Sequence, residues 1–212
     1  MASRNPAPSK SAPRPVRPAR AAKPPNEVRI IGGQWKRTKL PVADRPGLRP
    51  TPDRVRETLF NWLGHDLAGW RCVDAFAGTG ALGLEAASRG ASQVLLVESE
   101  GAQVDVLRAL LRKLGAHTVS VERGNALTVL QRLAPGSMDV VFLDPPFDAA
   151  VHAKAVAAAV PLLQPEGCIY LEAPTAWSEL ELAAHGLVLS RHMKAGAVHA
   201  HLLRRAGAGT GP

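Results

Sequence analysis

The stretch that decides the fold is Cys72-Val73-Asp74-Ala75-Phe76-Ala77-Gly78-Thr79-Gly80-Ala81-Leu82-Gly83. A short apolar run leads into a loop of small residues, and a segment that we expect to be helical follows over residues 81–89 until Gly90. A strand that turns through glycines into a helix is typical of the opening of a βαβ unit. Glycines allow the backbone to approach a ligand closely, and the free amides of the helix favour an anionic ligand group. We therefore expect a cofactor site at this turn.

Strand-like runs alternate with helical segments along the rest of the chain. The expected strands are Cys72-Val73, Val94–Val97, Val119–Val121, Val140–Leu143 and Ile169–Leu171, and the expected helices lie near 81–89, 102–114, 126–134 and 149–163. This alternation predicts a parallel sheet with helices on both faces. The pattern changes at Leu187–Met193 and Ala197–Leu203, which a short link joins. We predict an α/β fold of Rossmann type, mostly parallel, with a C-terminal antiparallel hairpin.

Charge and composition divide the chain into four parts. Residues 1–26 hold six of the 26 basic residues, none of the 18 acidic ones and seven of the 18 prolines, so the remainder carries 20 − 18 = +2. Such a composition predicts a disordered basic tail, which either attracts a polyanion or only aids solubility. We expect a small β-hairpin extension over 27–50, a catalytic domain over 51–206 and a flexible end over 207–212.

Several function classes are excluded by what the sequence does not contain. It has no run of the roughly 18–20 apolar residues that a membrane helix needs, and no apolar stretch follows the basic N-terminus as in a secretory signal. Cys72 and Cys168 form neither a disulfide framework nor a metal-ligand spacing, and we expect both to be inert core residues. His199 and His201 are expected on one face of a strand, at the surface or facing RNA, without metal. We expect a soluble, cytoplasmic monomer.

The glycine loop is compatible with two cofactors. Gly78, Gly80 and Gly83 satisfy the dinucleotide fingerprint, and Glu98 follows about 20 residues on, as that fingerprint requires. Asp74 argues for S-adenosylmethionine, because a carboxylate at the end of the first strand can bind an ammonium and would repel a pyrophosphate. Glu98 can accept the ribose hydroxyls, and Asn125 can bind adenine, cap a helix, or both. The predicted cofactor residues are Asp74, Phe76, Ala77, Gly78, Thr79, Gly80, Glu98, Asn125 and Ala126.

The chemistry is indicated by Asp144-Pro145-Pro146-Phe147, which follows the fourth expected strand. Ligands of open parallel sheets bind beyond the carboxyl ends of the strands, so this motif should lie beside the glycine loop. An exocyclic base amine is a poor nucleophile because its lone pair is delocalised into the ring. The Asp144 carboxylate and the Pro145 carbonyl can accept its two N–H groups, the prolines remove competing donors, and Phe147 offers a stacking face. We predict an amino-group methyltransferase in which these four residues are catalytic.

The segment before the first parallel strand should contact RNA. Basic residues around one tryptophan suit phosphate contact and base stacking, although a solvated ribbon whose Trp35 packs on the core would have the same composition. Thr51 and Pro52 are typical of a helix start, and Val55, Leu59, Trp62 and Leu63 should face the core. The predicted RNA-binding residues are Arg29, Trp35, Lys36, Arg37, Lys39, Arg49 and Arg54.

Four motifs in order carry a family resemblance: residues 29–35 (RIIGGQW), 49–63 around Arg49-Pro50-Thr51, the loop and helix over 76–86, and Asp144–Phe147. Together they resemble the bacterial 16S ribosomal RNA guanine-N2 methyltransferases, of the type that modifies guanine 966 of the small subunit, from about Arg29 to Arg204. The resemblance implies a guanine N2 target on an assembled or assembling subunit. Pro52 and Ala75 depart from the family pattern without touching the chemistry. A DNA adenine-N6 methyltransferase and a non-catalytic RNA-binding assembly factor remain alternatives.

Overall fold

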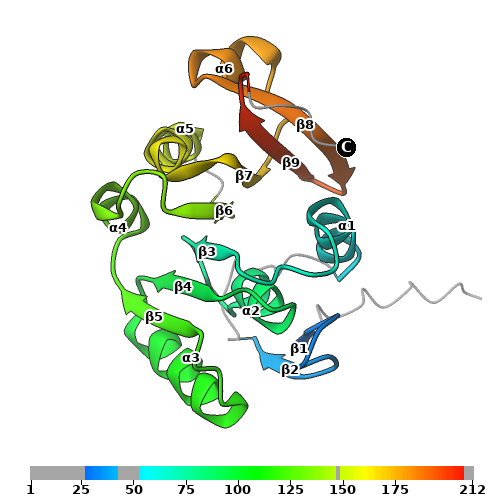
Figure 1. Ribbon diagram of the computed structural model, residues 1–212, viewed down its shortest axis with the longest axis vertical. Coiled ribbons are helices and arrows are strands. Elements are labelled where there is room, and N and C mark those ends of the chain that lie inside the picture. The colour runs from blue at the N-terminus through cyan, green and yellow to red at the C-terminus, as the bar shows by residue number, and fades with distance from the viewer. Residues whose placement is uncertain (1–26, 43–52, 147–148, 208–212) are drawn as a thin grey trace, which may run out of the picture.

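A seven-stranded sheet forms the centre of the computed structural model, which describes residues 27–42, 53–146 and 149–207. Its spatial order is β5-β4-β3-β6-β7-β9-β8, as Figure 1 shows. The first five of these strands pair in parallel, whereas β9 pairs antiparallel with both β7 and β8. The bounds are β3 Arg71–Asp74, β4 Gln93–Glu98, β5 Val119–Arg123, β6 Met138–Leu143, β7 Leu163–Ala173, β8 Leu187–Ala195 and β9 Val198–Arg205. The predicted sheet with its C-terminal hairpin is confirmed.

Helices cover both faces of this sheet, because neighbouring residues of a strand point to opposite sides. Val140 and Phe142 of β6 lie in one core cluster, and Val141 and Leu143 lie in the other. Side chains of α1, α2 and α3 fill the first cluster, and those of α4, α5 and α6 fill the second. The helices are α1 Asp53–Leu63, α2 Ala81–Ser88, α3 Gly101–Leu114, α4 Ala126–Arg132, α5 Ala149–Ala159 and α6 Glu179–Ala184. The predicted contact of α1 with the core is confirmed: Val55 and Leu59 are buried, and the half-buried Trp62 and Leu63 pack against the first cluster. Phe60, which was not predicted, is fully buried in the same cluster.

The N-terminal hairpin forms a separate two-stranded sheet that packs against α2 (Figure 1). Its strands are β1 Glu27–Arg29 and β2 Lys39–Pro41, paired antiparallel. Val28, Ile30 and Leu40 are buried in the same core cluster as α1 and α2. Glycine is required at position 33, where φ is +72° and a Cβ would overlap the Ser88 carbonyl oxygen. The predicted helix start at Thr51-Pro52 and the boundary at residue 50 lie outside the described residues.

Three features of the C-terminal third differ from what the sequence predicted. The helix expected over 149–163 ends at Ala159, because Pro161 enters a 3-10 turn over Val160–Leu162. Strand β7 begins at Leu163, six residues before the expected start, and its polar Gln164 and Glu166 hide that beginning in the sequence. Helix α6 was not predicted at all. It is six residues long, and a capping box between Ser178 and Glu181 starts it.

Candidate active site

The glycine loop is fixed by hydrogen bonds to both strands that flank β3. The Ala75 amide donates to the Phe142 carbonyl at 3.1 Å, and the Ala77 amide donates to the Val97 carbonyl at 2.9 Å. Gly80, with φ of +76°, is the N-cap of α2. Apart from the Phe76 carbonyl at 4.0 Å, nothing in the described structure lies within 4 Å of a Cβ built on Gly78. There is therefore open space beside the backbone at Gly78, and its contact with a cofactor stays a prediction.

Glu98, at the end of β4, connects this loop to the start of α3. One carboxylate oxygen accepts from the Gly78 amide at 3.0 Å, and the other accepts from the Glu100 amide at 2.9 Å and the Ser99 hydroxyl at 3.4 Å. The opposite side of the loop is held by Gln103 of α3, whose side-chain amide donates to the Gly78 carbonyl at 2.8 Å. The Glu98 side chain is half-buried. Because a carboxylate oxygen can accept two hydrogen bonds, the oxygen that accepts from Gly78 has acceptor capacity for a ribose hydroxyl.

Asp74 is more deeply placed than the sequence suggested. It is 1% exposed, and one of its oxygens accepts from the Gly83 amide at 2.9 Å, so it fastens the first turn of α2 to the end of β3. Burial raises the pKa of Asp74 to about 7, and repulsion from Glu98 and Glu172 adds to the shift, while hydrogen bonds from the Gly83 and Phe76 amides oppose it. A nearby cation would lower the pKa of this carboxyl, because it stabilises the charged form.

The remaining predicted cofactor residues are distributed around the loop and the start of α4. Phe76 is half-buried beside the second core cluster, and Thr79 is 7% exposed. Asn125 caps α4, because its side-chain oxygen accepts from the Thr128 amide at 3.2 Å, so the predicted capping role is confirmed. Asn125 is nevertheless exposed, and Ala126 next to it is buried. A contact with adenine by Asn125 stays a prediction.

Sheet register brings the Asp144 motif to the glycine loop. Asp74 is paired with Phe142 across β3 and β6, so Asp144 follows two residues beyond the level of Asp74 at the same edge of the sheet. Asp144 is half-buried, Pro145 is buried and Pro146 is exposed. Phe147 lies outside the described residues. The structure therefore places the first three residues of the motif beside the predicted cofactor loop, as the topology required.

Two functional candidates on β7 were missed in the sequence. Leu143 pairs with Leu171, so Asp144 and Glu172 follow at the same level on neighbouring strands. Glu172 is 3% exposed and accepts a hydrogen bond of 2.8 Å from the Tyr170 hydroxyl. Burial, then the charges of Glu172 and Asp144, raise the pKa of Tyr170 well above its usual value. Only the pairing of β6 with β7 shows that these groups adjoin Asp144.

The hairpin residues predicted to bind RNA are mostly exposed. Arg29, Lys36, Arg37, Lys39 and Arg54 are all exposed, whereas Trp35 is half-buried and packs against the first core cluster. The Trp35 amide donates to the Ser88 hydroxyl at 2.9 Å, and that hydroxyl donates to the Gly32 carbonyl at 2.6 Å. The packing of Trp35 on the core, which the sequence left open, is thus observed. Arg49 lies outside the described residues.

A buried ionic network under this hairpin was also missed. Glu85 of α2 is fully buried, and its oxygens accept from the Ile31 amide at 2.6 Å and the Gly32 amide at 2.8 Å. The same carboxylate pairs with Arg89 at 2.8 Å and lies 3.8 Å from Arg56, which is fully buried as well. The helix that begins at the glycine loop therefore also holds the hairpin.

Comparison with known proteins identifies the family of this chain. Residues 28–204 match the family described as conserved hypothetical protein 95. The ribosomal RNA small subunit methyltransferase D of Haemophilus influenzae is 38% identical over 178 residues, which make up 78% of this chain and 92% of that protein. The protein of the same name from Escherichia coli K12 is 52% identical over 122 residues. The match covers 57% of this chain and only 61% of the length of the Escherichia coli protein. The chain belongs to the ribosomal RNA small subunit methyltransferase D family.

Solved structures share the architecture of this chain. The Escherichia coli protein yhhF superposes with a TM-score of 0.71 at 41% identity, covering 84% of this chain and 98% of that one. The precorrin-6y C5,15-methyltransferase of Geobacter metallireducens, at 18% identity and a TM-score of 0.62 over 77% of this chain and 92% of that one, shares the fold alone. Residues 1–26 lie outside the family match, as the resemblance predicted.

Three expectations about other residues can be compared with the structure. Cys72 and Cys168 are buried free thiols, so their predicted place in the core is confirmed, and burial raises the pKa of Cys168 to about 12 and that of Cys72 further. The expectation for His201 was wrong: the side chain is fully buried, because its strand packs under the loop that carries Trp177. Within the described residues, no cluster of three or more histidine, cysteine, aspartate or glutamate side chains could hold a metal ion. None of the helices described there is long and apolar enough to cross a membrane.

Proposed function

We propose that this chain transfers a methyl group from S-adenosylmethionine to the exocyclic N2 of a guanine in 16S ribosomal RNA. The observation that carries the proposal is the placement of Asp144, Pro145 and Pro146 at the carboxyl end of β6, next to the Asp74 loop. Membership of a family whose relatives are named ribosomal RNA small subunit methyltransferase D supports the substrate class. We further propose that the protein acts as a cytoplasmic monomer on the small ribosomal subunit.

The chemistry of the loop fits the proposed cofactor. S-adenosylmethionine supplies an electrophilic methyl group on a sulfonium and carries a cationic ammonium. Asp74, Glu98, Asp144 and Glu172 all lie at strand ends along one edge of the sheet, which gives this edge a negative potential that suits a cation and repels a pyrophosphate. Glu98 would hold the ribose, Asp74 the methionine end, and Asn125 with Ala126 the adenine. Phe76, Ala77, Gly78, Thr79 and Gly80 would form the surface against which the cofactor lies.

The Asp144 motif would then orient the amine. Asp144 and the Pro145 carbonyl accept the two N–H groups of guanine N2, which directs the nitrogen lone pair at the methyl group. As the nitrogen–carbon bond forms, the sulfur–methyl bond of the cofactor would break and the sulfonium would leave as a neutral thioether. The Asp144 carboxylate would stabilise the positive charge that grows on the nitrogen. Tyr170 and Glu172 act behind Asp144 as positioning residues, since their hydrogen bond is buried at the same level. The methylated nitrogen is acidic, so its proton leaves without a strong base.

The test offers labelled S-adenosylmethionine and unmethylated small subunits to the full chain and maps the modified base by mass spectrometry. We expect one N2-methylguanine. Asp144→Ala should lower the rate constant by at least about 10²-fold, with cofactor affinity unchanged within about threefold. Asp105→Ala, which removes an exposed carboxylate on α3, is the matched control and should leave the rate unchanged. Full activity of Asp144→Ala would refute the role of Asp144. N6-methyladenine in duplex DNA would support the DNA alternative, and no turnover on any substrate would support the assembly-factor alternative.

A further inference from the structure

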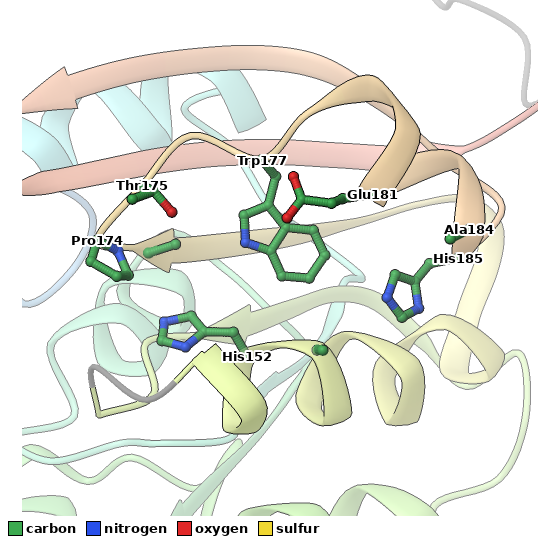
Figure 2. Close-up of a pocket in the computed structure, with 9 residues that line it drawn as sticks. His152, Pro174, Thr175, Trp177, Glu181, Ala184 and His185 are labelled. Atoms are coloured by element: carbon green, nitrogen blue, oxygen red, sulfur yellow. The ribbon is translucent and has the colours of Figure 1, made fainter.

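A groove of about 250 Å³ lies beside the proposed active site and has no role in it. It is formed between the first turns of α5 and the segment that links β7 to α6, as Figure 2 shows. The side chains that define it are His152 of α5, Pro174, Thr175 and Trp177 of the linking segment, Glu181 of α6 and His185. In Figure 2 the indole of Trp177 and the carboxylate of Glu181 lie together over this space.

The position of the groove relates it to the Asp144 motif. Helix α5 begins at Ala149, five residues after Asp144, and the linking segment begins directly after Ala173, the last residue of β7. The groove therefore opens at the same edge of the sheet as the proposed methyl transfer. Yet Asp144, Pro145 and Pro146 are not among its lining residues. A molecule in the groove is a neighbour of the reacting group and is not itself methylated.

The lining chemistry selects against phosphate and for a flat, neutral ring. Among the described lining residues there is no lysine or arginine, and the charged side chain is a carboxylate, which repels phosphate. An aromatic face and an acceptor are what an unstacked nucleobase needs. The volume lies below the roughly 300–1,000 Å³ of sites for larger ligands, so it suits one base.

Both proposed contact groups are held in place. The Trp177 amide donates to Nε2 of the buried His201 at 3.2 Å, and Nδ1 of His201 lies 3.2 Å from the Leu171 carbonyl oxygen, which fixes the protonated nitrogen as Nδ1. Burial lowers the pKa of His201 to about 4, so the ring is neutral at pH 7, as this pair of contacts requires. Glu181 is tied through one oxygen to the Ser178 amide at 2.7 Å and hydroxyl at 2.6 Å. Its second oxygen can still accept.

We propose that this groove binds the nucleobase that adjoins the target guanine in the RNA, stacked on Trp177 and donating an N–H group to Glu181. This inference rests on the proposed function, because it concerns the RNA that the same active site modifies. A base with an exocyclic amine is the class that fits, because one of its N–H groups can be donated to the second oxygen of Glu181, the first being occupied by Ser178. Holding the neighbour would draw the target out of its stack.

The first test separates stacking from packing at Trp177, which is half-buried beside the second core cluster. Trp177→Phe keeps an aromatic face, and Trp177→Leu keeps apolar volume but not the face. With unmethylated small subunits as substrate, the Leu variant should raise KM for subunits about 5- to 150-fold, the range that removal of one base–aromatic stack predicts. The Phe variant should stay within about threefold of the parent. In both variants kcat and KM for S-adenosylmethionine should be unchanged, and thermal melting confirms folding.

The second test concerns the Glu181 acceptor. Glu181→Gln preserves the capping box, because glutamine also serves at this helix position, but it removes the charge and one of the two acceptor oxygens. We expect KM for subunits to rise about 3- to 30-fold. Glu179→Gln is the matched control, because it neutralises an exposed carboxylate on the same helix that does not line the groove. That variant should behave as the parent.

Equal KM values for the Phe and Leu variants of Trp177, or an unchanged KM in Glu181→Gln, would overturn the proposed groove. Failure of the proposed function is recognised separately, because the parent chain would then not methylate subunits at all. In that case the dissociation constants of the same variants for unmethylated subunits, from filter binding, take the place of KM. Weaker binding confined to Trp177→Leu and Glu181→Gln would support the groove even then.

Discussion

Replacing Glu85 with alanine should cost more stability than any surface substitution, because it removes the centre of the buried ionic network. The carboxylate is fully buried and accepts from the Ile31 and Gly32 amides and from Arg89, with Arg56 at 3.8 Å. Removing one partner of a buried ion pair costs about 3–5 kcal/mol, since the other charge is left without compensation. At about 2–4 °C per kcal/mol for a chain of this size, the melting temperature should fall by about 6–20 °C.

The matched control is Asp105→Ala, which removes a carboxylate from a surface pair. Asp105 is 3.9 Å from Arg108, and the two side chains are 79% and 51% exposed. Such pairs contribute about 0–1 kcal/mol, so this melting temperature should stay within about 4 °C of the parent. Differential scanning calorimetry gives both shifts, and limited proteolysis shows whether the hairpin over 27–42 is cleaved in Glu85→Ala. A shift of Glu85→Ala no greater than that of Asp105→Ala would refute the assigned role of the network.

Three further predictions follow from the loop and the hairpin. The pKa of Asp74 is about 7 and a bound cation favours its charged form, so affinity for S-adenosylmethionine should rise as the pH increases through 7. Asp74→Asn should remove this rise. Titration calorimetry at pH 6 and pH 8 measures both affinities. Gly83→Ala should destabilise the fold by about 1–3 kcal/mol in urea unfolding, because its Cβ would overlap the Leu96 side chain, and stability equal to the parent would contradict the tight packing of α2. Neutralising the hairpin cations Lys36, Arg37 and Lys39 together should weaken binding to small subunits. The slope of log K against log salt should decrease in magnitude by about 0.7–0.9 for each phosphate that the variant no longer neutralises. An unchanged slope would mean that RNA binds elsewhere.

Local signals were enough to predict the elements that hold the candidate site. The glycines at 78 and 80 permit the turn from a strand into a helix, and Pro145 and Pro146 lack the amide hydrogens that a buried strand needs, which favours the end of the strand before them. Both signals come from residues that are adjacent in sequence, so no tertiary contact is needed to interpret them. The strand start at Leu163 and the short helix α6 escaped prediction because their local patterns are weak and the packing of the sheet decides them.

The sequence by itself determined the parallel sheet, the glycine loop at Asp74 and the Asp144 motif at the carboxyl end of β6, because strand periodicity and turn chemistry are local. Only the tertiary structure decided what surrounds these groups. It buried Asp74 beneath Gly83, set Glu172 beside Asp144, and turned Glu85 toward Ile31, which is 54 residues away in the chain. The state of a carboxyl depends on its burial and on the charges that packing brings near it, and neither is encoded in its neighbours along the sequence.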